Sequence, residues 1–259
     1  MTERIAIIGD GLIGRSIKLA SLRHEPSAEV RSFDRGDDLA GVSEATIVVL
    51  AAPVDAILQL LPSLPAIAPA ARLITDTGST KAHIVRAASA AGLTTFVAGH
   101  PMAGGTRSGP TDARATLFDG RPWFLIESGT TSAAFASATR FVQRLGAVTV
   151  SLNDGGEHDR LVAAISHLPQ VVATALLARV GETVGTAGLA HSGAGLRDTT
   201  RLAASDASVW APILATNASA VAPLLKELAR DLEAAADGLD DPIALARLFE
   251  RARRFSFDP

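Results

Sequence analysis

Near the N-terminus, residues 5–14 read IAIIGDGLIG. The apolar run Ile5–Ile8 does not alternate with polar residues, which is typical of a parallel strand buried on both faces. Three glycines follow with the G-x-G-x-x-G spacing, at Gly9, Gly11 and Gly14. In a strand–turn–helix unit these glycines make a tight turn, admit a pyrophosphate and allow close helix–strand packing. The stretch therefore predicts a dinucleotide-binding fold.

The residues around this turn extend the predicted cofactor site. Leu12 and Ile13 begin an apolar helix face, and the next strand ends at Asp34, 25 positions after the first glycine of the turn. An acid near this spacing accepts hydrogen bonds from the adenosine ribose. Asp34 favours NAD because a carboxylate repels a 2′-phosphate, whereas Arg35 could pair with that phosphate and keeps NADP possible. The alternative is a glycine turn that binds nothing.

Alternating strands and helices continue to about residue 150. Thr46–Ala51 is expected to be a buried strand, and Ala52 and Pro53 at its end are expected to line the cofactor site. Further segments with strand or helix patterns lie at 29–33, 73–75, 94–98, 122–126, 132–145 and 147–150. We expect an α/β domain over residues 1–152, of the Rossmann type, with one doubly wound sheet.

A histidine lies in FVAGHPMAGGTRSG, residues 96–109. His100 has small or rigid neighbours, which let the backbone approach a ligand closely. We expect it in a loop just past a strand end, where an open parallel sheet binds ligands. Its imidazole could accept a proton near neutral pH. The alternative is a surface histidine. Residues 105–122 are expected to form a loop over the site.

The segment DTGSTK, residues 76–81, is polar and follows another expected strand. Ser79 could place its hydroxyl beside the nicotinamide. Alternatively, Ser79 or Thr80 could cap the helix that begins near Lys81. The two roles are compatible with each other.

The pattern changes after residue 156, where no convincing strand follows. Apolar residues with helical spacing indicate a long helix through residues 161–176, and Pro169 is expected to kink it. More helices are expected near 194–204, 208–217, 219–237 and 241–254. We expect residues 153–259 to form an all-α domain for substrate binding and dimerisation. The alternative is that its apolar faces form only the core of a monomer.

Composition excludes several classes of function. The net charge of −3 and the 4% aromatic content do not favour a nucleic-acid-binding surface. The sequence has no cysteine, which removes disulfides and thiolate metal sites, and no metal site is expected. Charged residues, glycine and proline interrupt the apolar runs, and no signal-peptide pattern is visible. We therefore expect a cytoplasmic enzyme with a small-molecule substrate and no membrane partner.

Five ordered motifs give the chain a resemblance to the prephenate/arogenate dehydrogenase family over nearly its whole length. They are GDGLIG at 9–14, DTGSTK at 76–81, GHPMAG at 99–104, HDRLVAAISHLPQ at 158–170 and GLRDTTRLAASDASVW at 195–210. The resemblance implies an NAD-dependent oxidative decarboxylation that serves tyrosine biosynthesis, carried out by a homodimer built on the helical half. Hydride leaves the ring carbon that bears the hydroxyl, and the ring carboxylate departs as CO2.

The resemblance also implies roles for individual residues. His100 resembles the catalytic histidine that takes the proton of the substrate hydroxyl. Ser79 resembles the serine that bridges this histidine, the substrate and the nicotinamide. Arg201 resembles the arginine that pairs with a substrate carboxylate, although a surface charge is the alternative. His167 and Trp210 match family positions and could be substrate-facing or structural.

Two positions depart from the family pattern and bear on the substrate. Thr106 stands where the family often has a glutamate, and Gln170 stands where it often has a second substrate-binding histidine. Prephenate is the expected substrate, with arogenate or 4-amino-4-deoxyprephenate as the alternatives.

Two other classes of function fit the sequence less well. A 3-hydroxyacid or 6-phosphogluconate type of dehydrogenase would use a lysine in the helical half, where only Lys226 occurs, far from the motifs. An NAD-sensing protein without catalysis would not need His100, Ser79 and Arg201 together.

Overall fold

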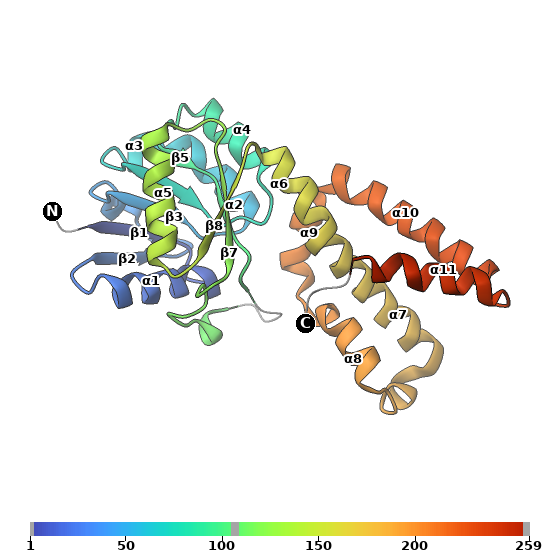
Figure 1. The fold of residues 1–259 in the computed structure, drawn as a ribbon. Coiled ribbons are helices and arrows are strands. Elements are labelled where there is room, and N and C mark those ends of the chain that lie inside the picture. The colour runs from blue at the N-terminus through green and yellow to red at the C-terminus, as the bar shows by residue number, and fades with distance from the viewer. Residues whose placement is uncertain (1–2, 105–108, 256–259) are drawn as a thin grey trace.

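The computed structural model describes residues 3–104 and 109–255, in which an α/β part is followed by a helical part (Figure 1). The α/β part is built on a parallel five-stranded sheet with the order β2-β1-β3-β4-β5. Its strands are β1 (Arg4–Ile8), β2 (Glu29–Phe33), β3 (Ile47–Leu50), β4 (Leu73–Asp76) and β5 (Phe96–Val97). The strand order reverses between β1 and β3, which creates the crevice where such sheets bind ligands.

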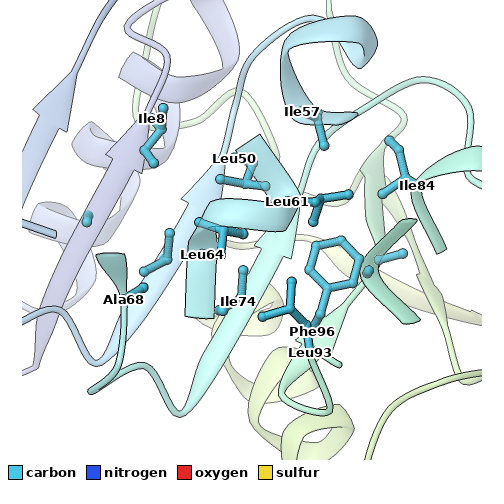
Figure 2. Close-up of a cluster of buried hydrophobic side chains, with 14 of the residues drawn as sticks. Ile8, Leu50, Ile57, Leu61, Leu64, Ala68, Ile74, Ile84, Leu93 and Phe96 are labelled. Carbon is cyan, nitrogen blue, oxygen red and sulfur yellow. The ribbon is translucent and has the colours of Figure 1, made fainter. Parts of the chain in front are cut away.

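Helices cover both faces of this sheet, as expected for a doubly wound fold. Ile5 and Ile7 pack on one face with α1 (Leu12–His24) and α5 (Ser132–Arg144). Ile8 packs on the other face against the helices that follow β3 and β4 (Figure 2). These are α2 (Val54–Leu60), η2 (Leu61–Ser63), α3 (Leu64–Ile67) and α4 (Ala82–Ala90), and η1 (Leu39–Val42) precedes β3. The first strand lacks alternation because both of its faces are buried.

The expected single sheet is wrong in one respect, because the last strands form a second, three-stranded sheet. It contains β6 (Gly99–Pro101), β7 (Pro122–Ile126) and β8 (Val148–Leu152), with β6 antiparallel to β7 and β7 parallel to β8. The chain passes from β5 to β6 through Ala98, whose carbonyl accepts a hydrogen bond from the Ile126 amide at 3.0 Å. The change of sheet at this residue carries His100 away from the end of β5.

The helical part begins with a long helical segment that is kinked at Gly185 (Figure 1). It comprises α6 (Gly155–Val162), a π-helical turn η4 (Ala163–His167) and α7 (Leu168–Leu189). The other elements are α8 (Ala194–Thr200), η5 (Arg201–Ala204), α9 (Ala207–Thr216), α10 (Ala218–Asp237) and α11 (Pro242–Arg253). The elements from α8 onward agree with the helices expected from the sequence, whereas the first helix is longer than the expected 161–176. In Figure 1, α10 and α11 extend side by side away from the α/β part.

A π-helical turn, Ala163–His167, ends directly before α7, which has Pro169 in its first turn. This turn includes Ile165, whose carbonyl the proline ring would crowd in a regular α-helix. The helix is thus distorted next to the position at which the kink is expected. Non-helical dihedral angles also occur further on, at Gly185, with φ of 66° and ψ of −179°.

Within the described ranges, the helix Gly155–Leu189 has the length and hydropathy of a membrane span, with a mean hydropathy of 1.8. Helices α9 and α10 meet the same criteria only as a pair bent by 97°. Only 28% of the apolar 18-residue stretch of this helix is buried within the chain. The helix therefore presents apolar surface outside the core of its own chain.

Candidate active site

The glycine turn lies at the reversal of strand order between β1 and β3. Gly9 has φ of 113°, and a Cβ there would come within 2.3 Å of the Ala51 carbonyl oxygen. A Cβ at Gly14 would lie 1.9 Å from the Gly9 carbonyl oxygen, so α1 packs directly on the turn. At Gly11, by contrast, a Cβ would meet no described atom within 4 Å. Two glycines are thus required by the turn itself, and the third leaves open space at the amino end of α1, as phosphate binding needs.

The other predicted cofactor residues surround this turn. The Gly9 amide donates to the Phe33 carbonyl at 2.7 Å, which holds the end of β2 beside the turn. Asp34 follows on the surface, and its Oδ1 accepts from the Arg35 amide at 2.8 Å. A cavity of about 410 Å³ next to it is lined by Asp10, Arg15, Lys18, Leu19, Ser32, Asp34 and Asp37. This arrangement provides a place for a ribose beside a carboxylate.

Leu12, Ile13, Ala52 and Pro53 lie at the same edge of the sheet. Leu12 and Ile13 form the first turn of α1 and pack partly on the core. Ala52 follows β3, and Pro53 is the N-cap residue of α2. The structure thus brings the predicted cofactor residues to the carboxyl ends of β1, β2 and β3, whereas their contact with a cofactor stays a prediction.

A buried ion pair joins the end of β4 to the start of β6. The Lys81 ammonium is fully buried, pairs with Asp76 and donates to the Gly99 carbonyl at 2.8 Å. The other Asp76 oxygen accepts from the Gly99 amide at 3.0 Å. Burial lowers the pKa of Lys81, and the carboxylates of Asp76 and Asp159 oppose that shift. Both polar groups of Gly99 are therefore fixed immediately before His100.

His100 lies within β6, paired with Phe124 of β7, and not in a loop beyond a strand as expected. Its side chain is buried, with 9% exposure, so the alternative of a surface histidine is also wrong. Burial holds the pKa of His100 well below its usual range, and the positive charge of Lys81 lowers it further. The imidazole is therefore neutral at pH 7, as a proton acceptor must be.

His158 of α6 contacts His100 from the helical part, and the neighbouring Asp159 contacts His158 in turn. His100 Nδ1 lies 2.9 Å from His158 Nε2, and His158 Nδ1 lies 2.9 Å from Asp159 Oδ1. Burial lowers the pKa of His158, and the hydrogen bond to Asp159 opposes that shift. Burial alone would raise the pKa of Asp159. Hydrogen bonds from His158 and from the Lys81 and Ala82 amides outweigh burial, so that the pKa is lowered. His158 and Asp159 were missed as site residues, although both lie in the motif at 158–170.

Asp159 also caps the amino end of α4. Its two oxygens accept from the amides of Lys81 at 2.7 Å and Ala82 at 2.9 Å. The alternative that Ser79 or Thr80 caps this helix is therefore wrong, because a carboxylate from α6 does so. Thr80 instead bonds the Thr216 hydroxyl at 3.0 Å. Ser79 is half-buried between β4 and α4, and its predicted contact with the nicotinamide stays a prediction.

His167 is buried at the end of the π-helical turn of the same helix. Asn217 Nδ2 donates to the Asp159 carbonyl at 2.8 Å and lies 3.1 Å from His167 Nδ1. The Trp210 ring meets the imidazole edge to face, with centroids 5.9 Å apart. Burial lowers the pKa of His167 to about 4. His167 is therefore neutral, and because Nδ1 accepts from Asn217, Nε2 carries its proton.

Gln170 and Arg201 are brought together, but not by direct contact. Gln170 is buried; its amide nitrogen donates to the Leu202 carbonyl at 2.9 Å, and its oxygen accepts from Ser205 at 3.4 Å. Gln170 thus holds η5, the segment that begins with the exposed Arg201. A substrate contact of either residue stays a prediction. Thr106 lies outside the described residues.

The segment after His100 returns toward α1. Residues 109–122 contain η3 (Pro110–Asp112), and the Arg114 amide donates to Ser16 Oγ at 3.1 Å. The expected irregular loop is therefore tied, in its described part, to the helix that follows the glycine turn.

The sequence was compared with known families and proteins. Residues 12–151 match the prephenate dehydrogenase nucleotide-binding domain, and residues 154–245 match the prephenate dehydrogenase dimerization domain. A cyclohexadienyl dehydrogenase of Zymomonas mobilis is 32% identical over 89% of this chain and 86% of its own. A prephenate dehydrogenase of Lactococcus lactis is 29% identical over 97% of this chain and 76% of its own.

A solved structure agrees with the fold. It is a prephenate dehydrogenase from Aquifex aeolicus in complex with hydroxyphenyl propionate and NAD+, with a TM-score of 0.87 and 22% identity. The match covers 98% of this chain and 97% of the other. The α/β part is thus a nucleotide-binding domain, and the helical part that follows it is a second domain, as expected. With both domains matched in order, the chain belongs to the prephenate dehydrogenase family.

Proposed function

We propose that this protein catalyses the NAD-dependent oxidative decarboxylation of prephenate to 4-hydroxyphenylpyruvate, a step of tyrosine biosynthesis. Membership of the family and the names of its relatives support the proposal. The observation that carries it is His100, a buried and neutral imidazole on β6 that the helical domain contacts. The residue before it, Gly99, is hydrogen-bonded to Asp76 at the carboxyl end of β4. Proton removal from a substrate hydroxyl needs such a base.

The reaction balances with one acid–base group. NAD, when bound at the glycine turn, supplies the acceptor for the hydride that leaves the carbon bearing the hydroxyl. His100 takes the hydroxyl proton as the carbon–oxygen double bond forms. The bond from the ring to its carboxylate then breaks, CO2 departs, and the electron pair makes the ring aromatic. The oxygen regains the proton from His100, so no net proton is released.

Other predicted site residues would bind the substrate. Arg201 would pair with a carboxylate, since a guanidinium donates two parallel hydrogen bonds to that group. His167 would present Nε2–H, and Ser79 would donate or accept beside the nicotinamide. Gln170 would act through the position of Arg201, because its amide is engaged by η5. Thr106 would influence the choice of substrate, because it stands where the family often has a glutamate.

The cofactor proposal rests on the open space at Gly11 and the carboxylate of Asp34. NAD is preferred over NADP because Asp34 and Asp37 both line the adjacent cavity, where a 2′-phosphate would be repelled. Arg35 on the same turn would weaken this preference. Comparison of the KM values for the two cofactors tests it.

We also propose that the protein is a cytoplasmic homodimer joined through the helical domain, with the domain boundary near residue 152. The matched family describes this half as a dimerization domain. Large apolar side chains are exposed on α10, on α11 and in the turn between them, namely Leu232, Leu239, Ile243, Leu248 and Phe249. A stable dimer buries such residues. Sedimentation of a monomer at micromolar concentration would contradict the dimer.

A substrate comparison tests the proposed reaction. Purified protein with NAD is supplied in turn with prephenate, arogenate and 4-amino-4-deoxyprephenate, and NADH formation is followed. The highest kcat/KM is expected with prephenate. Turnover of arogenate without turnover of prephenate would keep the mechanism and reject the substrate. No turnover with any of the three would reject the proposed function.

A further inference from the structure

The chain from His100 to Asp159 fixes where the protons of both imidazoles lie. Asp159 Oδ1 accepts from the Lys81 amide at 2.7 Å and lies 2.9 Å from His158 Nδ1. Its lowered pKa keeps the carboxylate ionised, so that it can only accept. His158 Nδ1 must therefore carry the hydrogen of this bond.

The same reasoning extends to His100. Burial lowers the pKa of His158, whose charged neighbours are Asp159, Lys81 and Asp76, and the ring is neutral at pH 7. A neutral imidazole with its hydrogen on Nδ1 has a lone pair on Nε2. The 2.9 Å contact with His100 then requires His100 Nδ1 to be the donor. His100 is left with its lone pair on Nε2.

We propose that His158 and Asp159 are positioning residues that hold His100 in the Nδ1–H tautomer, so that His100 Nε2 is the proton acceptor. This proposal deepens the proposed function and rests on it for the effect on turnover. In the opposite tautomer the Nε2 of His100 would carry a hydrogen and could not accept a proton. The role of His158 is thus to select one protonation pattern of the neighbouring ring, as a hydrogen-bonded partner does for other catalytic histidines.

The arrangement also links the two domains to the base. Asp159 and His158 lie on α6 of the helical domain, whereas His100 and the α4 amides belong to the nucleotide-binding domain. Asp159 binds the α4 amides through both of its oxygens, so the nucleotide-binding domain fixes the position of this carboxylate. The carboxylate in turn orients His158. Correct docking of α6 is therefore a condition for the active tautomer.

Nitrogen-15 NMR of histidine-labelled protein reads the tautomer without any substrate. At about pH 8, above the usual histidine pKa, His100 is expected to show a protonated Nδ1 and an unprotonated Nε2. The His100→Asn variant assigns its signals. A protonated Nε2 on His100 would overturn the proposal whether or not prephenate is the substrate.

Two substitutions of His158 separate selection of the tautomer from packing. His158→Phe keeps a ring but removes both nitrogens, and kcat is expected to fall roughly 10²-fold with little change in KM. His158→Gln can accept from His100 and donate toward Asp159, so it is expected to recover most of the loss and restore the Nδ1–H signal. Wild-type kcat in His158→Phe would overturn the proposal. If that variant does not fold, His158→Gln decides: Nδ1–H with retained kcat supports the proposal, and a changed tautomer with unchanged kcat overturns it.

A matched control lies at the same domain contact. Thr216→Val removes the 3.0 Å hydrogen bond between the hydroxyls of Thr216 and Thr80 without touching the histidines. It is expected to leave the His100 tautomer unchanged. A changed tautomer in Thr216→Val would overturn the assignment to His158 and point to docking in general. If wild-type protein does not oxidise prephenate, the proposed function fails, and the NMR result still decides the tautomer.

Discussion

Lys81 is fully buried against Asp76 and donates a hydrogen bond to the carbonyl of Gly99, the residue before His100. The ion pair binds both polar groups of Gly99 and so holds the strand β6 that carries His100. Removal of one partner leaves an unpaired charge in the core. Lys81→Met is expected to lower the free energy of unfolding by about 3–5 kcal/mol. Urea denaturation of Lys81→Met, Asp76→Asn and the double variant measures the coupling. Additive losses in the double variant would contradict a paired role.

Gly99 has no room for a side chain. A Cβ there would lie 2.9 Å from both the Asp76 carbonyl oxygen and Trp123 Nε1. Gly99→Ala is therefore expected to displace β6, to destabilise the protein by about 1–3 kcal/mol and to lower kcat through the position of His100. Gly104→Ala is the control for stability, since a Cβ there meets no described atom within 4 Å. Equal melting temperatures for the two variants would contradict the close packing.

Stability is expected to fall with decreasing pH because the histidines of the site are buried in the neutral form. The pKa of His167 is lowered to about 4, so the unfolded chain binds more protons between about pH 6.5 and 4, and stability is lost as pH falls through that range. Protonation of His167 in the unfolded chain is expected to remove on the order of 3 kcal/mol from the free energy of unfolding over this pH range. Thermal unfolding across this range checks the prediction. His167→Gln should flatten the profile, and parallel profiles for the variant and the wild type would contradict it.

Arg201 is exposed at the start of η5, which Gln170 holds through the Leu202 carbonyl. If Arg201 pairs with a substrate carboxylate, Arg201→Ala should raise KM for the substrate by roughly 10–100-fold and leave NAD affinity nearly unchanged. Arg197→Ala, an exposed arginine of the preceding helix, is the matched control. Equal effects of the two substitutions on KM would remove the special role of Arg201.

The parts of the fold that sequence predicts well are those encoded locally. The apolar run of β1 and the glycine turn are specified by residues within ten positions of one another, and the structure confirms both. The later helices of the second domain follow from periodicity and are confirmed to within a few residues, whereas the first extends well beyond the expected 161–176, from Gly155 to Leu189. The resemblance to the family is also confirmed by the matched domains.

The parts that sequence did not predict depend on packing between distant residues. His158 and His100 are 58 positions apart, and only the docking of α6 brings them into contact. One signal was present: His158 lies four residues before the buried Val162, so helical periodicity puts this polar side chain on the buried face. The change of sheet at Ala98 likewise depends on contacts of Ala98 and Gly99 with β7 and β4, which no local pattern reveals.

The central claim is that His100 is the base of an NAD-dependent oxidation of prephenate. The most direct test is NADH formation by wild-type protein and His100→Asn with saturating NAD and prephenate, together with the NAD affinity of each. The account predicts turnover by the wild type, a loss of roughly 10²–10⁴-fold in the variant and similar NAD affinity in both. Wild-type turnover by His100→Asn would contradict it.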